Sequence, residues 1–210
     1  MVWDLPTRLF HWSFVVSIVG AFLTGREGNL FWHEIFGLAA LGLFVFRIIW
    51  GFVGHESARF KIFLAGPKKI WVYLTGLTHR RNQPTPGHNP LGALSVLALL
   101  GLMGSLGVTG LWTGDDILYE GPMTFLAPGW AGFAGRWHLL LQELILPLVG
   151  LHVAALVAHR VFLKERLVQR MITGGSDETA PKPTRTLAGL ILLLICLSAA
   201  ISLAAITPNY

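Results

Sequence analysis

Five long runs of apolar residues divide the chain, and short polar segments separate them. The runs cover roughly residues 9–25, 33–53, 91–113, 138–160 and 186–206. A helix of about 20 residues spans a bilayer core about 30 Å thick, so each run is long enough to cross a membrane. The apolar residues are continuous rather than alternating, which disfavours a transmembrane β-barrel. The pattern therefore predicts an all-α integral membrane protein with five transmembrane helices.

The composition supports this class. Of 210 residues, 53% are hydrophobic and 13% are charged, and the mean hydropathy is +0.61. Soluble domains carry about twice that charged fraction. A net charge of +5 could indicate nucleic-acid binding, but the basic residues lie between the apolar runs, where membrane topology places them. The first run follows a start that has neither a basic segment nor a clear cleavage site, so it is interpreted as a span rather than a removed signal peptide.

Basic residues also predict the orientation of the helices. Thirteen of the sixteen Lys and Arg residues fall on one side: Arg8, six in the segment 54–90, and six from Arg160 to Arg185. Cytoplasmic loops carry such an excess, so this side is predicted to face the cytoplasm. The N-terminus would then be cytoplasmic, and the odd number of spans would place Tyr210 outside.

Two connecting segments have features of their own. Gly66-Pro67 could start a helix in which Ile70, Trp71 and Leu74 share one face beside two lysines, as in an amphipathic helix lying on the inner leaflet. Residues 174–185 are rich in Gly, Pro and polar residues, and this composition predicts a flexible linker to the last span.

Four of the eight histidines lie in or at the ends of predicted spans: His11, His33, His138 and His152. Ionisable residues at such depths are costly, so each is a functional candidate. His138 and His152 are fourteen residues apart. On one straight helix this spacing separates them by about 21 Å along the axis and leaves their side chains pointing within roughly 40° of the same direction. Counting depth along the spans then pairs His33 with His138 near the outer surface and His11 with His152 near the inner surface. Two imidazoles on different helices at one depth suit the axial ligation of a haem.

Other interpretations of the histidines remain open. A single histidine at a span end is more often an interfacial polar group than a ligand. His159 shares the face of His152 and lies near the inner boundary, so it is a weaker alternative ligand. His88 could contact a haem edge or cap a helix, and His55 and His79 are expected to be solvated loop residues.

Further residues could complete a cofactor pocket. Gly104 and Gly107 belong to a set of glycines at three-residue spacing, which would let a flat cofactor or simply another helix approach closely. Arg47 lies fourteen residues after His33 and could pair with a haem propionate, or extend to the inner headgroups instead. The single cysteine, Cys196, cannot form a covalent CxxCH haem attachment, so any haem would be bound non-covalently.

Several separate motifs carry a resemblance to a known family. They are VWDLPTRLFHW at the N-terminus, FRIIWGFVG, GHNPLGAL, GLH and RMITG. Together they resemble the bacterial cytochrome b561 family, and more narrowly the membrane cytochrome b subunits of nickel–iron hydrogenases. The resemblance covers residues 1–173 and implies a four-helix bundle that holds two b haems through His11, His33, His138 and His152. The fifth span, 186–206, lies outside this pattern and would pack against a partner subunit.

The resemblance implies a membrane cytochrome of the bacterial plasma membrane that passes electrons between an outer redox protein, such as a cytochrome c or a hydrogenase, and the quinone pool. The quinone would bind near the inner end, close to Arg8, Arg47 and His88, and the acidic outer loop 115–137 would dock the outer partner. Such a subunit performs no bond chemistry of its own. Two alternatives stay open: a membrane anchor in which haem is mainly structural, and a small metal or proton transporter.

Overall fold

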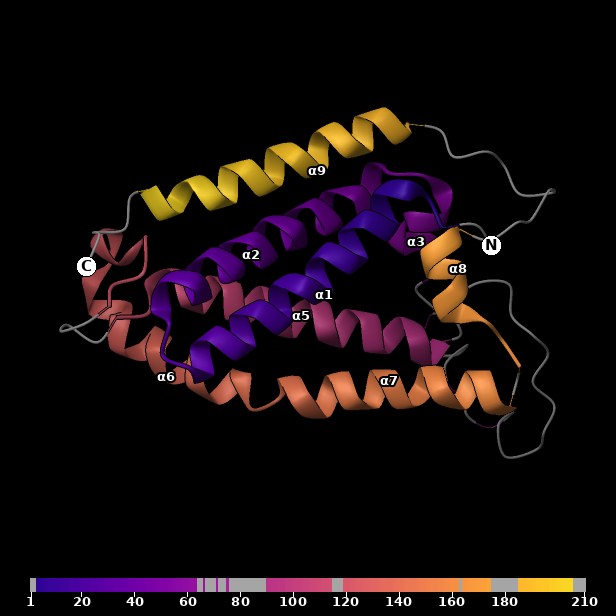
Figure 1. The fold of residues 1–210 in the computed structure, drawn as a ribbon, viewed down its shortest axis with the longest axis horizontal. Helices are drawn as coiled ribbons and strands as arrows, with labels where there is room; N and C mark the ends of the chain where they lie inside the picture. The colour runs from indigo at the N-terminus through magenta and orange to yellow at the C-terminus, as the bar shows by residue number, and fades with distance from the viewer. Residues whose placement is uncertain are drawn as a thin grey trace.

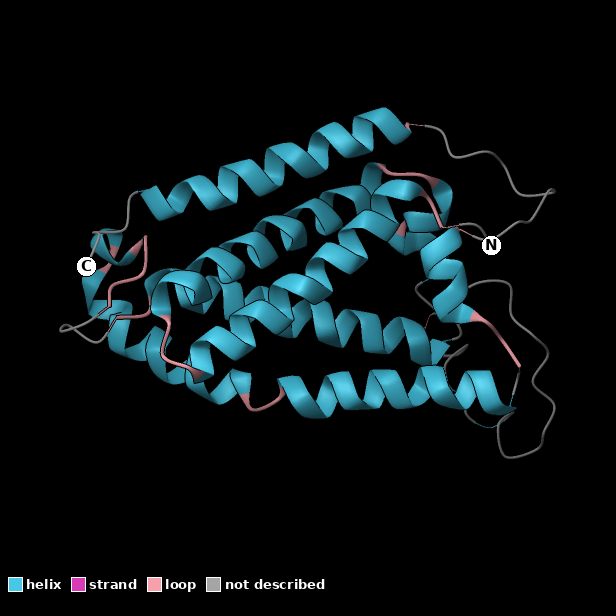
Figure 2. Cartoon of the chain, viewed as in Figure 1, coloured by secondary structure: helices cyan, strands magenta, loops and turns pink. Residues whose placement is uncertain are grey.

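The computed structural model describes residues 3–63, 66, 71, 75, 90–114, 119–162, 164–174 and 185–205. Its long helices are α1 (Leu5–Arg26), α2 (Leu30–Val53), α5 (Pro90–Trp112), α6 (Ala131–Gln142), α7 (Ile145–Phe162) and α9 (Thr186–Ile201). The shorter ones are η1 (Glu56–Ala58), α3 (Phe60–Phe63), η2 (Thr124–Leu126), η3 (Pro128–Trp130), α8 (Leu167–Thr173) and η4 (Ser202–Ala205). The described residues contain no β-strand (Figure 2), only one isolated bridge between Gly114 and Glu120. Five helical stretches among these described residues are long and apolar enough to cross a membrane, which confirms the predicted all-α membrane class.

Helix α2 lies at the centre of the bundle. It packs against α1, α5 and α9, while α5 also packs against α6 and α7 (Figure 1). A tight turn joins α1 to α2, and Gly28 adopts a positive φ of 72° there, a conformation that glycine adopts without a steric penalty. The long helices run back and forth between two ends, which we call the turn end, where α1 meets α2, and the basic end, where the N-terminus, α3 and α8 lie (Figure 1).

The described basic residues divide unequally between these ends. The turn end carries Arg26 and Arg136, whereas the basic end carries most of the others: Arg8, Arg59, Lys61, Arg160, Lys164, Arg166, Arg170 and Arg185. This is the distribution from which the cytoplasmic side was predicted. The orientation itself remains a prediction.

Helix α1 begins four residues before the predicted span because its N-terminus is capped. The Asp4 carboxylate accepts a hydrogen bond from the Thr7 amide, and Pro6 occupies the first turn. An acidic cap and an early proline are favourable helix starts because the first amides have no partner inside the helix.

The fourth predicted span is not one continuous helix. It begins at Ala131, earlier than predicted, and is interrupted at Glu143 and Leu144 between α6 and α7. Pro147 lies just after the interruption and has no N–H for the carbonyl of Glu143, so a regular helix cannot pass through this point undisturbed. The rise and rotation expected for a straight helix from His138 to His152 therefore do not apply as stated.

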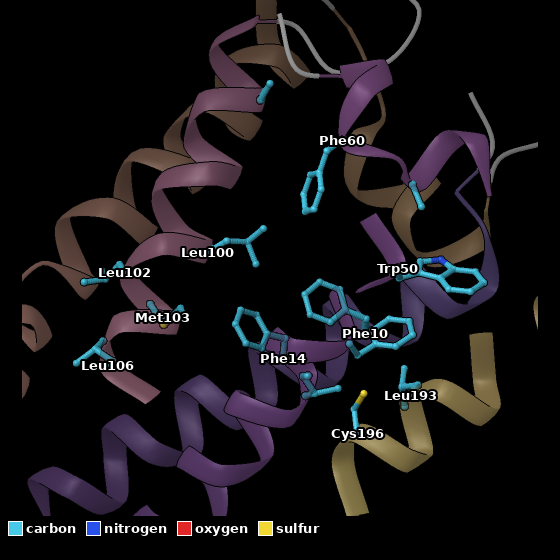
Figure 3. Close-up of a cluster of buried hydrophobic side chains, with 14 residues drawn as sticks. Phe10, Phe14, Trp50, Phe60, Leu100, Leu102, Met103, Leu106, Leu193 and Cys196 are labelled. Atoms are coloured by element: carbon cyan, nitrogen blue, oxygen red, sulfur yellow. The ribbon is translucent and has the colours of Figure 1, made fainter. Parts of the chain in front are cut away.

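The buried core lies between α1, α2, α5 and α9. Phe46 and Trp50 of α2 are 0% and 2% exposed, and their rings stack with centroids 5.9 Å apart. Phe10 and Phe14 of α1 pack beside them (Figure 3).

Helix α9 is an integral part of this bundle. Leu193 and Cys196 reach the core from α9, and a side chain added at Gly42 of α2 would lie 2.6 Å from the Cys196 carbonyl oxygen. At the basic end, the Arg185 guanidinium donates a hydrogen bond of 3.0 Å to the carbonyl of Val53, the last residue of α2. One face of the fifth span is thus occupied within the chain, and the prediction of a partner subunit can concern only its other face.

Candidate functional site

Two histidines meet near the turn end of the bundle. His33 lies in the first turn of α2, and His138 lies in α6. Their ring centroids are 6.0 Å apart and the rings are nearly perpendicular, at 85°. The structure therefore brings together the pair that depth counting predicted for the outer side.

Each of these rings is oriented by a hydrogen bond to a helix backbone. The Nδ1 of His33 is 2.7 Å from the carbonyl oxygen of Ala21 in α1, and the Nδ1 of His138 is 3.1 Å from the carbonyl oxygen of Leu106 in α5. A carbonyl can only accept, so Nδ1 of each neutral ring carries the proton, and Nε2 keeps its lone pair. Metal-binding histidines are typically held in this way, with one nitrogen bonded to the protein and the other facing the metal.

Glycines provide room for both rings. A Cβ added at Gly25 would lie 2.8 Å from the Nδ1 of His33, and one added at Gly110 would lie 3.4 Å from the His138 ring. The first distance is too short for real atoms, so α1 can pass His33 only because residue 25 has no side chain.

Gly25→Ala is therefore expected to displace the His33 ring and to weaken cofactor binding at this pair by roughly tenfold, as removal of a ligand-orienting contact typically does. The measurement is the haem content of the purified protein after titration with haem. Gly132→Ala in α6 is the matched control, because nothing lies within 4 Å of a Cβ built there. Equal haem binding by the Gly25→Ala and Gly132→Ala variants would contradict this role for Gly25.

The second pair lies toward the basic end. His11 of α1 and His152 of α7 are close enough to interact electrostatically. The Nδ1 of His11 is buried and has no hydrogen-bond partner among the described residues. A buried polar atom without a partner is costly, so a ligand for this ring would remove an unfavourable feature of the protein alone.

These two pairs suit a haem better than a bare metal ion. The described part of the chain contains no group of three or more His, Cys, Asp or Glu side chains that could hold an ion, whereas protein zinc sites use at least three such ligands. A haem, by contrast, would need only two imidazoles from the protein, as each of these pairs would supply. The rings of His33 and His138, with centroids 6.0 Å apart and each ring held by a backbone carbonyl, would be placed to hold such a group between them.

Comparison with known proteins agrees with this chemistry. A sequence model described as prokaryotic cytochrome b561 matches residues 2–174. This chain belongs to the prokaryotic cytochrome b561 family. Two curated relatives, from Azotobacter chroococcum mcd 1 and Azotobacter vinelandii, are each 26% identical to it over 82% of this chain and 86% of their own length. Both are described as probable Ni/Fe-hydrogenase B-type cytochrome subunits. No solved structure matches the chain.

The protein is thus a bacterial membrane cytochrome of b type, its cofactor is haem b, and its role is electron transfer. Residues 186–206, which contain α9, lie beyond the part that the family model matches.

The structure places Arg47 of this cytochrome near the basic end, in the interior of the bundle. Its side chain is 5% exposed, its guanidinium lies 4.6 Å from the centroid of the Phe60 ring, and the Asp4 carboxylate is near enough to attract it. The Phe60 ring and the Asp4 carboxylate offset part of the free-energy cost of burying the Arg47 charge. A contact between Arg47 and a haem propionate remains a prediction.

The two glycines predicted to border a haem lie between helices. Cβ atoms added at Gly104 and Gly107 of α5 would meet the side chains of Phe44 and Leu41 of α2 at 2.6 and 2.9 Å. Both glycines therefore let α5 approach α2 closely, and their contact with a cofactor remains a prediction.

The remaining histidines differ in their surroundings. His159 of α7 hydrogen-bonds through Nδ1 to the Glu165 carboxylate at 2.9 Å, so it has a partner that His11 lacks. The prediction of a solvated His55 is wrong, because this ring is 8% exposed and hydrogen-bonds with Ser57 in η1. His79, His88 and most of the predicted amphipathic segment lie outside the described residues.

Two functional candidates escaped the sequence analysis. Asp4 is 1% exposed and accepts a 2.8 Å hydrogen bond from the Trp50 indole, a contact between residues too far apart in sequence to be anticipated. Glu143 is an exposed carboxylate at the interruption between α6 and α7. The sequence does mark Glu143, because it is an acidic residue inside the apolar run of the fourth predicted span.

Proposed function

We propose that this cytochrome relays electrons across the bacterial plasma membrane between an outer redox protein and the quinone pool, through two haems b. His33 and His138 would ligate the haem nearer the turn end, and His11 and His152 the haem nearer the basic end. The observation that chiefly supports the proposal is the His33–His138 pair, whose ring centroids lie 6.0 Å apart and whose Nδ1 atoms hydrogen-bond to backbone carbonyls.

A relay needs cofactors at two depths, and the helix arrangement provides them. His33 lies at the start of α2 and His11 near the start of α1, and these helices run in opposite directions, so the two pairs lie toward opposite ends of the bundle (Figure 1). Haem b, when bound, supplies an iron that takes up and releases a single electron. The chain's own contribution is to fix the imidazoles, to exclude water with the aromatic residues of the core, and to balance charge near the basic end through Arg47.

The orientation and the partners complete the proposal. The basic end would face the cytoplasm, with the N-terminus inside and the C-terminus in the periplasm. The outer loop 115–137 would dock a hydrogenase-like protein or a cytochrome c, in keeping with the description of the two Azotobacter relatives as hydrogenase cytochrome subunits. A quinone would react near the inner haem, in the region of Arg8 and Arg47; His88 is a further candidate there but lies outside the described residues.

The experiment that tests this function is quinol oxidation by the purified protein in liposomes. A soluble menaquinol or ubiquinol analogue is expected to reduce both haems, as seen in a b-type reduced-minus-oxidised spectrum. An impermeant oxidant outside the vesicles is then expected to draw electrons continuously from quinol inside them. Haems that are reduced by dithionite but by neither quinol would contradict the quinone half of the proposal.

A further inference from the structure

Helices α6 and α7 present two different faces. Partly buried residues recur along one side of both helices and face the bundle: His138, Leu141, Ile145, Leu148 and His152. The opposite side is exposed along its whole length, and its large apolar side chains include Leu140 and Leu146, which are 62% and 59% exposed. We call this opposite side the outward face of α6–α7.

Glu143 lies on the outward face, at the interruption between the two helices. It follows His138 by five residues, a rotation of about 140° away from the histidine side. It also lies between the depths of His138 and His152, roughly 7 Å along the axis from His138, and so within the hydrocarbon region. A carboxylate that faces lipid at this depth is strongly unfavourable, and such residues normally face protein or water.

No partner for this carboxylate exists in the described part of the chain. None of the described residues forms an ion pair with Glu143. The nearest basic residue on the same face, Arg136, precedes it by seven residues, or roughly 10 Å along the helix. The other described Lys and Arg residues belong to elements at the two ends of the bundle, and Arg47, near the basic end, is buried against Phe60.

The same face carries small residues at helix-packing spacing. Gly150 and Ala154 each lie two residues from His152, about 160° around the helix from it, and both are exposed. Nothing lies within 4 Å of a Cβ built at Gly150. Small residues four apart let a second transmembrane helix approach closely, and here they continue the face that Glu143 begins.

We propose that the outward face of α6–α7 binds a transmembrane helix of another protein, and that this helix carries a basic residue near its midpoint that pairs with Glu143. Charge complementarity selects this occupant, because a negative group within the membrane is best balanced by a positive one. A second copy of the same chain is a poorer occupant, since the described residues include no exposed Lys or Arg near the middle of a long helix. Gly150 and Ala154 would let the two backbones pack together.

The test uses the full-length holo-cytochrome in lipid nanodiscs and two synthetic helices. One is a leucine-alanine transmembrane helix with a single lysine at its midpoint, and the other has leucine in that position. Association is measured as quenching, by the haems, of a fluorophore on the helix. The lysine helix is expected to bind about tenfold more tightly, in line with polar contacts between membrane helices. Glu143→Gln should remove most of this preference, and Gly150→Ile should weaken the binding of both helices.

Leu194→Glu provides a matched control, because Leu194 is 61% exposed on α9. The double variant with Glu143→Gln and Leu194→Glu has its carboxylate on a different exposed surface, that of α9. This double variant is not expected to regain the preference for the lysine helix. A regained preference for the lysine helix in the double variant would overturn the proposal. Equal binding of the two helices to the unmodified protein would overturn it as well. The proposal would also be overturned if the unmodified cytochrome formed dimers and the Glu143→Gln variant did not, because a second copy of the chain would then occupy the outward face. An unchanged haem spectrum in every variant shows that the bundle is intact, so these outcomes are independent of the electron relay.

Discussion

His138→Ala is expected to leave the purified cytochrome with one haem per chain and to stop electron transfer across the bilayer. Removal of the imidazole would leave His33 as the one histidine of this pair, and a single imidazole would hold the haem too weakly to retain it. Its loss also frees the Leu106 carbonyl, which accepts the hydrogen bond from His138. Haem content is measured as pyridine haemochrome per protein, and transfer as the quinol-driven reduction of an external oxidant in liposomes.

A series of single variants identifies the ligand set. His152→Ala is expected to give the same halved content, but to retain the spectrum of the other haem, since it removes the inner ligand. His159→Ala is the control: this ring lies on the same helix but is bonded to Glu165, and its removal should leave two haems. Full haem content in His138→Ala, or a loss in His159→Ala, would contradict the proposed pairs.

The same variant separates a relay from a membrane anchor in which haem is structural. An anchor would lose assembly with its redox partner when His138 is replaced, yet any complex that still assembled would transfer electrons at the normal rate. A relay predicts the opposite in assembled complexes, because the electron path is interrupted at the outer pair. The rate per assembled complex is therefore the informative quantity.

The spans and the pairing of histidines could be predicted from sequence for a simple reason. Both depend mainly on the number of residues between positions, because a transmembrane helix converts residue number into depth. The pairing survives the interruption in the fourth span, since α7 continues in the same general direction as α6 (Figure 1). The depth of a residue along a span is therefore predictable from residue number even where the helix is interrupted, whereas the direction of its side chain around the axis is not.

Features that depend on long-range packing could not be predicted in this way. The interruption at Glu143 lies in an apolar run where Pro147 gives only a local hint, since proline is tolerated in membrane helices. The burial of His55 depends on a short turn formed with Ser57. The close approach of α9 to Gly42 joins segments more than 150 residues apart in the sequence. Periodicity contains no information about any of these contacts.

Asp4→Ala is expected to destabilise the holo-cytochrome by about 3–5 kcal/mol, the cost typical of breaking a buried charged contact. Asp4 is 1% exposed and links the start of α1 to the end of α2 through three interactions. One oxygen caps α1 through the Thr7 amide, the other accepts the Trp50 indole hydrogen at 2.8 Å, and its charge attracts Arg47. Alanine would leave the indole N–H and the guanidinium buried without this acceptor. The measurement is the midpoint of thermal denaturation, followed through the haem absorption, which is expected to fall by roughly 10 °C.

Asn29→Ala is the matched control for the capping part of this effect. Asn29 caps α2 as Asp4 caps α1, through a 3.3 Å bond to the Trp32 amide, but it is exposed and has no indole or guanidinium to balance. Its loss should cost only about 1 kcal/mol. Asp4→Asn should fall between the two alanine variants, because an amide can still cap the helix and accept one hydrogen bond but carries no charge. Equal losses in Asp4→Ala and Asn29→Ala would mean that Asp4 acts as a cap alone, and that the buried charge of Arg47 is balanced elsewhere.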